Sequence, residues 1–293
     1  MKCDARHIEW TIGEYHARPE VARSSIEDCI TTDGPALQLD WQLFKGRYID
    51  KPPAYPRKAS KALDDGNVAH ACLTSPGGIA DVVAVIPPEV LNAQGHRKGK
   101  AWSEWKDANA GKIQRTAGEM AAVRCMVRNV FAHPRGAWLM EHAQHYEFSL
   151  VYECPASGLP CRARPDLLVG LRGQILLVDF KTTKCLTARE FAWDMERYGY
   201  HRQFAWYKEA VELFGHTVAG CLAITVDKSP AHRVRVHEVS ERAVRLGHQQ
   251  NHAHRLELAR RLQENDWTDP TDKQVAVIDL PERAYDWKGD VAA

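Results

Sequence analysis

A continuous apolar run that ends abruptly in an acid and a base is the feature that most constrains this chain. Residues Ile175–Val178 are typical of a strand buried on both faces, and Asp179, Phe180 and Lys181 follow directly. Because side chains alternate along a strand, Asp179 and Lys181 leave the same face. Phe180 leaves the opposite face and is expected to pack in the core. An acid and a base therefore stand side by side at a strand end.

A second acid is predicted to lie beside this pair. Residues 161–170 read as a less regular strand, and a hairpin turn at 170–173 would fold Asp166 back against Asp179. Two carboxylates this close repel, and Lys181 neutralises only one of them. A divalent cation satisfies both, so the pattern predicts a hard-metal site for Mg²⁺, with Mn²⁺ as a substitute. In such a site Lys181 would orient or help to deprotonate an attacking water, or offset charge on a phosphate.

A simpler interpretation exists for each part of this pattern. Asp179 and Lys181 alone could be a surface ion pair at a strand end, and Pro165-Asp166 could be an ordinary turn signal. The combination of Pro-Asp, a short hairpin and an apolar run ending in Asp-Phe-Lys is much more specific than Asp-x-Lys, and it favours the metal site.

Composition narrows the class of protein. The 293 residues carry a net charge of +1, which argues against a strongly basic nucleic-acid coat but leaves room for a local basic channel. The N-terminus has no apolar segment typical of a secretory signal, and no run approaches the length of a membrane helix, so we expect a cytoplasmic protein. The eight cysteines include no C-x-x-C pair, which favours free thiols over disulfides or an iron–sulfur cluster.

The hydrophobic pattern predicts an α/β or α+β fold with a mixed central sheet flanked by helices. Short links favour an antiparallel meander of the first three strands, and Ser24, Thr116 and Thr187 each open a capping box with the glutamate three residues later. The expected strands are 145–153, 161–170, 174–180, 217–227 and 232–239, and the expected helices are 60–73, 116–133, 187–214 with a break at Gly199, and 240–265. We expect one domain over 1–293, with an N-terminal helical or irregular part (1–113, of which 74–113 resembles an insertion), a core (114–239) and a C-terminal helix and tail (240–293).

At this point the chain resembles a known family. The stretch "RPDLL…ILLVDFKTT" resembles the PD-(D/E)XK nuclease core, in particular its RecE-like (exonuclease VIII) and lambda-exonuclease-like branch. "GNVAH" (66–70) looks like the G-x-x-x-H motif, and "YGYHRQFAWY" (198–207) resembles the Y-x-Y-H-x-Q-x-x-x-Y stretch of RecE-type nucleases. "EYHARPEVARSSIE" (14–27) is similar to the opening of phage-borne relatives. The resemblance covers about 15–267 and implies a metal-dependent DNase, often a toroidal exonuclease in phage-type recombination.

The resemblance also assigns roles to individual residues. Asp166, Asp179 and Lys181 would be the catalytic acids and lysine, and His70 would approach the metal, although a satisfied core histidine is the simpler alternative. Glu147 is either a third metal carboxylate or an exposed charge where the first strand begins. Gln203 and Tyr207 share a helix face and would orient Lys181 or the scissile phosphate, or else are polar residues at the core rim.

Contacts with DNA are predicted from residues near the acids in sequence. Arg and Lys bind phosphates without reading bases, which suggests Arg162, Arg164, Arg172 and Lys184 as candidates. Tyr200 and His201 are further candidates for backbone contacts.

Three functions compete. The favoured one is a Mg²⁺-dependent exonuclease on linear duplex DNA, a homo-oligomeric ring that accepts DNA ends and works with a single-strand annealing protein. The second is an endonuclease or a Cas4-like nuclease of the same fold, and the cysteine spacing weakens the Cas4-like version. The third is a catalytically idle module that binds DNA ends, which the intact acid–acid–lysine set disfavours. None of the three requires a membrane.

Overall fold

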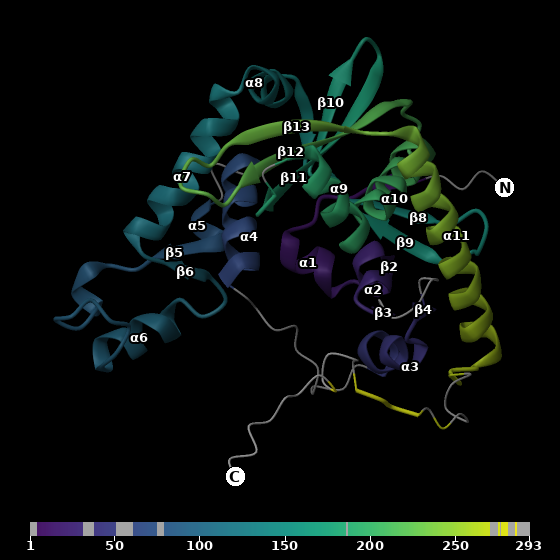
Figure 1. The fold of residues 1–293 in the computed structure, drawn as a ribbon, viewed down its shortest axis with the longest axis horizontal. Helices are drawn as coiled ribbons and strands as arrows, with labels where there is room; N and C mark the ends of the chain where they lie inside the picture. The colour runs from purple at the N-terminus through teal and green to yellow at the C-terminus, as the bar shows by residue number, and fades with distance from the viewer. Residues whose placement is uncertain are drawn as a thin grey trace.

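The protein is built around a mixed five-stranded sheet (Figure 1). The computed structural model describes residues 5–31, 38–50, 61–74, 79–185, 187–269, 275, 277–280 and 285. The strand order is β13 (Val234–Val239), β12 (Val218–Asp227), β11 (Gln174–Thr183), β10 (Leu167–Leu171) and β7 (Ala143–Tyr146). β11 and β12 run parallel, and the other neighbouring pairs are antiparallel. The predicted fold class, a mixed sheet flanked by helices, is confirmed.

Helices cover both faces of this sheet (Figure 1). One face packs against α4 (Lys61–Thr74) and α7 (Ala117–Ala132), and the other packs against α10 (Tyr200–Leu213), which in turn contacts α11 (Glu241–Glu264). The other described helices are α1 (Ile12–Ala17), α2 (Arg23–Glu27), α3 (Trp41–Phe44) with the π-helical turn η1 (Lys45–Ile49), α5 (Ile79–Val82), α6 (Lys100–Ala108), α8 (Pro134–Glu141) and α9 (Ala188–Arg197). Within the described residues, no helix has the length and apolar character needed to cross a membrane.

The apolar run in β11 is continuous because both of its faces are buried. Ile175 and Leu177 belong to the hydrophobic cluster on the α10 side, whereas Leu176, Val178 and Phe180 belong to the cluster on the α4 and α7 side. A strand between two helical layers has no solvent face, so the sequence shows no polar alternation there. The prediction that Phe180 packs into the core is confirmed.

The hairpin of β10 and β11 brings the two carboxylates together as predicted. A two-residue turn at 172–173 has φ of +49° and +80°, which matches the twist of the flanking strands. At the far end of the hairpin Leu167 pairs with Val178. One further step along this register places Asp166 opposite Asp179.

The predicted antiparallel meander of the first three strands is confirmed, but two of these strands are each divided between two sheets. The run 145–153 forms β7 and then β8 (Leu150–Glu153), while the run 161–170 forms β9 (Pro160–Ala163) and then β10. β8 and β9 belong to a second sheet, with β1 (Arg6–His7) and β2 (Val21–Ala22) at its edges. The chain leaves the first sheet at Glu147, whose φ is +50°, and returns at Pro165, which has no N–H for a ladder.

Helix starts were predicted well at two of three capping boxes. Thr116 and Thr187 cap α7 and α9 as expected, with both reciprocal hydrogen bonds present. The box at Ser24 was wrong, because α2 begins one residue after Ala22 and it is Ser25 that hydrogen bonds back to the Ala22 backbone. The predicted break at Gly199 separates α9 from α10.

The predicted insertion 74–113 is partly helical, with a small parallel pair that sequence reasoning missed. β5 (Val83–Val85) pairs with β6 (Ile113–Arg115), and the 3₁₀ turn η2 (Pro88–Val90) and α6 lie between them. Figure 1 shows this part extending away from the main sheet below α4 and α7. Another short pair, β3 (Ile30–Thr31) with β4 (Gln38–Leu39), lies near α3.

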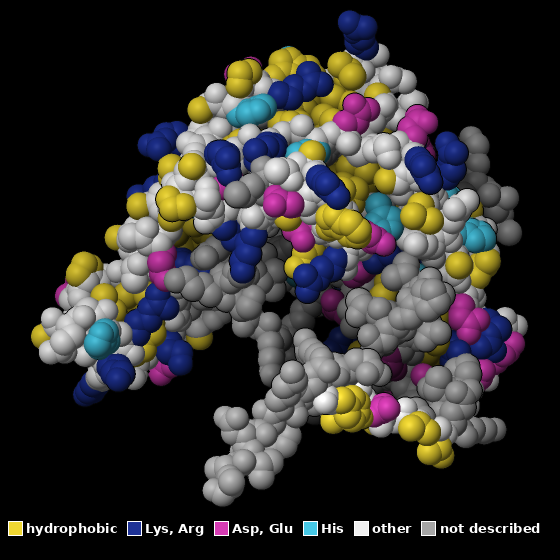
Figure 2. All heavy atoms as spheres, in the orientation of Figure 1, with side chains coloured by type: hydrophobic (Ala, Val, Ile, Leu, Met, Phe, Trp, Pro, Cys, Tyr) yellow, Lys and Arg dark blue, Asp and Glu magenta, His cyan; other side chains and the backbone are white. Residues whose placement is uncertain are grey.

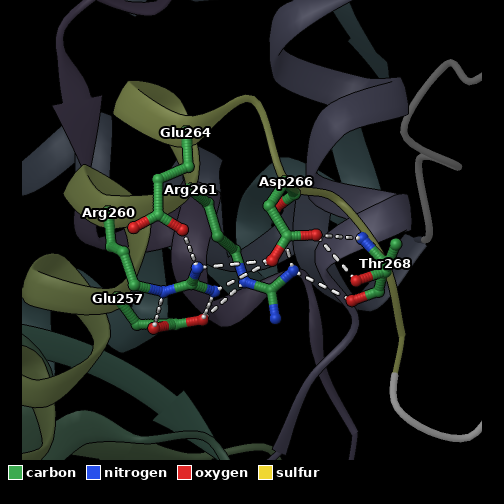
Figure 3. A network of polar contacts seen from close by, with 6 residues as sticks. All are labelled: Glu257, Arg260, Arg261, Glu264, Asp266 and Thr268. Atoms are coloured by element: carbon green, nitrogen blue, oxygen red, sulfur yellow. Dashed lines mark hydrogen bonds and ion pairs between the residues drawn. The ribbon is translucent and has the colours of Figure 1, made fainter.

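A network of ion pairs fixes the end of α11 (Figure 3). Glu257 accepts hydrogen bonds from Arg260 Nη2 at 2.8 Å and Arg261 Nε at 2.7 Å. Arg261 Nη1 then donates to the backbone carbonyls of Asp266 and Thr268, at 3.1 and 3.0 Å. The helix ends there at Asn265 in the left-handed conformation, so the following chain folds back onto the last turn.

Candidate metal centre

Asp166 and Asp179 form the buried centre of the candidate site. Their residues are 8% and 0% exposed, and Asp166 Oδ2 accepts a hydrogen bond from the Phe180 backbone N–H at 2.8 Å. This bond crosses the hairpin at the point where the β10 ladder ends. Two neighbouring carboxylates in such a buried place require compensating charge.

His70 from α4 supplies part of that charge. Its Nε2 lies 3.0 Å from Asp166 Oδ1, and its Nδ1 lies 3.0 Å from Glu147 Oε1. Burial by itself would lower the pKa of His70, but the carboxylates of Asp166 and Glu147 outweigh it and raise the pKa to about 9. The imidazole thus bridges two acids, and its raised pKa favours the protonated form.

The G-x-x-x-H spacing has a packing reason. Gly66 lies one helical turn before His70 on α4, and a Cβ at Gly66 would lie only 3.0 Å from Thr182 Oγ1 of β11. The absence of a side chain thus lets α4 approach the strand that carries Asp179. This approach brings His70 to the acids.

Glu147 lies in the connection from β7 to β8 rather than at the start of a strand, which corrects the prediction. Its φ of +50° turns the chain there, and its backbone N–H donates to Asp166 O at 2.9 Å. Its carboxylate forms an ion pair with Arg164 Nε through Oε2, on the side away from His70. Arg164 Nη1 also donates to Trp10 O and Ser149 Oγ, both at 2.9 Å. Arg164 therefore orients Glu147 toward His70.

Lys181 and Gln203 both contact Asp179. The Lys181 ammonium forms an ion pair with Asp179 Oδ2 and lies 4.9 Å from the centroid of the Tyr200 ring. Gln203 Nε2 donates to Asp179 Oδ1 at 3.2 Å and lies 2.9 Å from Tyr207 Oη. Gln203 of α10 thus contacts the acid of β11 directly, and Tyr207 contacts Gln203.

The two aspartates are shifted in opposite directions. Burial and the neighbouring charge of Asp166 raise the pKa of Asp179 to about 6, although Lys181 and His70 oppose this. Burial would also raise the pKa of Asp166, but the contact with His70 outweighs it and the pKa is lowered. Paired carboxylates with divergent pKa values are typical of functional sites.

The donor set fits a hard divalent metal. One ligand atom from each of His70, Glu147 and Asp166 can be chosen so that all lie within 4.8 Å of one another. Asp179 Oδ2 is buried and, apart from the Lys181 ammonium, has no hydrogen-bond donor among the described residues. Carboxylate oxygens with one imidazole suit Mg²⁺ or Mn²⁺ better than a metal that prefers sulfur.

Two residues predicted to contact DNA are buried elsewhere, and these predictions are corrected. Arg162 is 7% exposed, and its Nη1 donates to the carbonyls of Arg18 and Glu20, so no part of it faces a phosphate. His201 is 5% exposed between α10 and α11, with Nε2 2.8 Å from Gln250 Oε1. Arg162 and His201 are close to the motif residues in the sequence, but sequence distance does not show in which direction a side chain points.

The other four candidates lie in four different places. Arg164 is occupied by Glu147 and the backbone, Tyr200 is half-buried beside Lys181, and Lys184 is exposed just after β11. Arg172 is exposed at the hairpin tip, at the end of β11 opposite to Asp179. Figure 2 shows acidic and basic side chains intermingled on the part of the face between α4 and α9.

Sequence reasoning missed Tyr15 of α1. It is 8% exposed, and the guanidinium carbons of Arg162 and Arg164 lie 5.0 and 5.6 Å from its ring centroid. Burial raises its pKa to about 12, although Arg162 opposes the shift. Tyr15 therefore packs the N-terminal segment beside Arg164, the arginine that forms an ion pair with Glu147. Its place in the "EYHAR" stretch was the only signal available.

The chain resembles known proteins in sequence and in fold. A family model described as "PDDEXK-like domain of unknown function (DUF3799)" matches residues 49–273. The crystal structure of a "Putative exonuclease" from Eubacterium rectale aligns with a TM-score of 0.60 at 12% identity, over 94% of this chain and 96% of that one. Such an identity shows a shared fold alone. A second structure, SSO0001, has a TM-score of 0.26 at 14% identity over 37% of this chain and 48% of its own, and supports no conclusion. No curated protein matches the chain in sequence.

Proposed function

This chain belongs to the PDDEXK-like family, and from that premise we propose that it is a metal-dependent exodeoxyribonuclease that degrades linear duplex DNA from an end. The observation that carries the proposal is the cluster of His70, Glu147 and Asp166 donors beside the Asp179–Lys181 pair. Metal-assisted phosphodiester hydrolysis needs ligands for a metal and a charged group near the phosphate. This site offers three carboxylates, one imidazole and one ammonium.

The protein's own groups have distinct tasks in this proposal. Lys181 orients the attacking water or balances charge that develops on the phosphate, and Asp179 and the Tyr200 ring hold it in place. Gln203, itself in contact with Tyr207, positions Asp179 through a hydrogen bond.

Asp166, Asp179, His70 and Glu147 would hold the metal. When bound, Mg²⁺ or Mn²⁺ supplies Lewis-acid activation of the scissile phosphate. Asp166 and Glu147 raise the pKa of His70, and the same concentration of negative charge would favour a divalent cation at this place.

The finer parts of the proposal come from the sequence motifs. Their resemblance to RecE-like and lambda-exonuclease-like nucleases supports end-dependent action, a homo-oligomeric ring and phage-type recombination with a single-strand annealing protein. The likeness to a structure named an exonuclease agrees with the first of these. A single nuclease domain over 1–293 is part of the same proposal.

The test is digestion of end-labelled linear duplex DNA beside a covalently closed circle of equal sequence, with Mg²⁺ and with EDTA. The linear form should be degraded from its ends only with Mg²⁺, while the circle survives. Equal cutting of the circle would replace the exonuclease by an endonuclease. Binding of ends without any cleavage would leave the idle end-binding module.

A further inference from the structure

Two tyrosine rings lead from Lys181 to the protein surface. The Tyr200 ring centroid lies 4.9 Å from Lys181 Nζ, and the Tyr198 and Tyr200 ring centroids are 5.7 Å apart with an angle of 34° between the rings. Tyr200 is half-buried, whereas Tyr198 is 45% exposed. The outer ring therefore presents an open aromatic surface two contacts away from the proposed catalytic lysine.

This pairing requires the break between α9 and α10. Residues two apart on a continuous helix point to different sides, so their rings do not meet. Gly199, with φ of +62°, ends α9 and starts α10 between the two tyrosines. A Cβ on Gly199 would lie 2.3 Å from Arg202 Nη2 and 2.5 Å from the Glu27 carboxylate oxygens, so the ends of both side chains would have to shift.

The backbone of Tyr198 is held by two hydrogen bonds, whereas its side chain is partly exposed to solvent. Tyr198 N–H donates to Asp194 O at 2.9 Å, and Tyr198 O accepts a hydrogen bond from Arg23 Nη2. The guanidinium carbon of Arg197 lies over the Tyr198 ring, 5.5 Å from its centroid, so a base that stacks on that face would replace this contact. A fixed aromatic surface with a cation beside it suits a planar, electron-rich partner that carries a phosphate.

We propose that Tyr198 is a stacking platform for one unpaired nucleobase next to the scissile phosphate. The inference rests on the proposed nuclease function, which places a phosphate at Lys181. Every nucleobase has a flat face that stacks on an aromatic side chain, so such a platform tolerates any sequence.

A second exposed aromatic residue on α9 provides a matched control. Trp193 is 66% exposed, and no ring contact joins it to Tyr198 or Tyr200 within the described part of the chain. If any exposed aromatic side chain binds DNA non-specifically, Trp193 and Tyr198 should contribute equally to DNA binding. The stacking platform predicts that only Tyr198 contributes.

The experiment measures binding of short single-stranded oligonucleotides in EDTA, which prevents cleavage. The oligonucleotides are unmodified or carry one abasic nucleotide at each of the terminal positions in turn. Tyr198→Ala should weaken binding of the unmodified strand about tenfold, in the range known for base–aromatic stacking. Tyr198→Phe and Trp193→Ala should bind as the unchanged protein does. An abasic nucleotide at the stacked position should abolish the difference between Tyr198→Ala and the unchanged protein.

Two results would overturn the inference: equal binding by Tyr198→Ala, or a loss that persists at every abasic position. Cleavage of end-labelled linear duplex DNA in the presence of Mg²⁺ tests the proposed function separately. Cleavage without base-dependent binding at Tyr198 leaves the nuclease and removes the platform. Base-dependent binding with no cleavage removes the nuclease and leaves the platform.

Discussion

At the scale of single residues, each acid of the candidate site contacts at least one basic side chain. Asp179 is paired with Lys181, Glu147 with Arg164, and Asp166 shares His70 with Glu147. Substituting one partner should therefore change one property of the site and not all of them together.

The acids and the lysine should be essential for cleavage. Asp166→Asn, Asp179→Asn and Lys181→Ala are each expected to lower the rate by at least about 10² to 10⁴-fold, the usual contribution of a positioned acid–base group. Rates on end-labelled linear DNA with Mg²⁺ measure this, and circular dichroism confirms that each variant is folded. Full activity of Asp179→Asn would remove the central claim.

Arg164 should act on metal binding, because it orients Glu147. Arg164→Ala is expected to raise the Mg²⁺ concentration for half-maximal activity about 10- to 100-fold, as is typical for the loss of an outer partner of a metal ligand. Calorimetric titration with Mn²⁺ measures the same affinity without DNA. An unchanged metal affinity with weaker DNA binding would instead restore the original prediction that Arg164 contacts phosphate.

At the scale of elements, two glycines set the distances on which the site depends. Gly66 lets α4 approach β11, and Gly199 separates α9 from α10. In both places a Cβ would meet a named group on a neighbouring element.

Gly66→Ala should push α4 away from β11 and separate His70 from Asp166. We expect strain of about 1 kcal/mol, equivalent to a roughly fivefold loss of Mn²⁺ affinity. The added helix propensity of alanine works in the opposite direction for overall stability, so metal affinity is the proper measurement. The double variant Gly66→Ala, Thr182→Ala should recover affinity, because the Cβ would then have no Oγ1 to meet. If the double variant binds metal as weakly as the single one, the contact with Thr182 is not the cause.

Gly199→Ala should destabilise the fold more than an alanine at a comparable glycine. Gly158 has a similar φ of +66° and nothing within 4 Å of an added Cβ, so its substitution measures backbone strain alone. At Gly199 the overlap with Arg202 and Glu27 adds about 1–3 kcal/mol. Urea unfolding of the two variants gives the difference, and equal loss would exclude the overlap as a cause.

At the scale of the whole molecule, charge and assembly are connected. A net charge of +1 gives a weak overall field, so a monomer should hold duplex DNA poorly at physiological salt. Several subunits in a closed ring would place their exposed cations, Lys184 among them, around a shared channel. A ring that DNA enters from an end also gives processive digestion.

We therefore expect a homo-oligomer, a trimer or tetramer, in light scattering. The length distribution of DNA products at excess substrate should show full digestion of some molecules while others remain intact. A monomer whose products shorten evenly across all molecules would contradict the ring.

The sequence by itself determined the features that depend on neighbours along the chain. Alternation in β11 placed Asp179 and Lys181 on one side and Phe180 on the other, and a short hairpin turn fixed Asp166 opposite Asp179. These relations follow from strand periodicity and turn length, which are local.

Only the tertiary structure decided which distant side chains meet. His70 reaches the acids because Gly66 lets α4 pack against β11, and Glu147 reaches them because the chain changes sheets there. Arg162 lies only four residues before Asp166, yet it faces away from the site. Periodicity can show which face of an element a side chain leaves, but the neighbour it meets depends on packing between elements far apart in sequence. For that reason periodicity alone predicted the acid–acid–lysine set, whereas His70, Glu147 and Gln203 were suggested only by the resemblance to a family, and the burial of Arg162 was not foreseen.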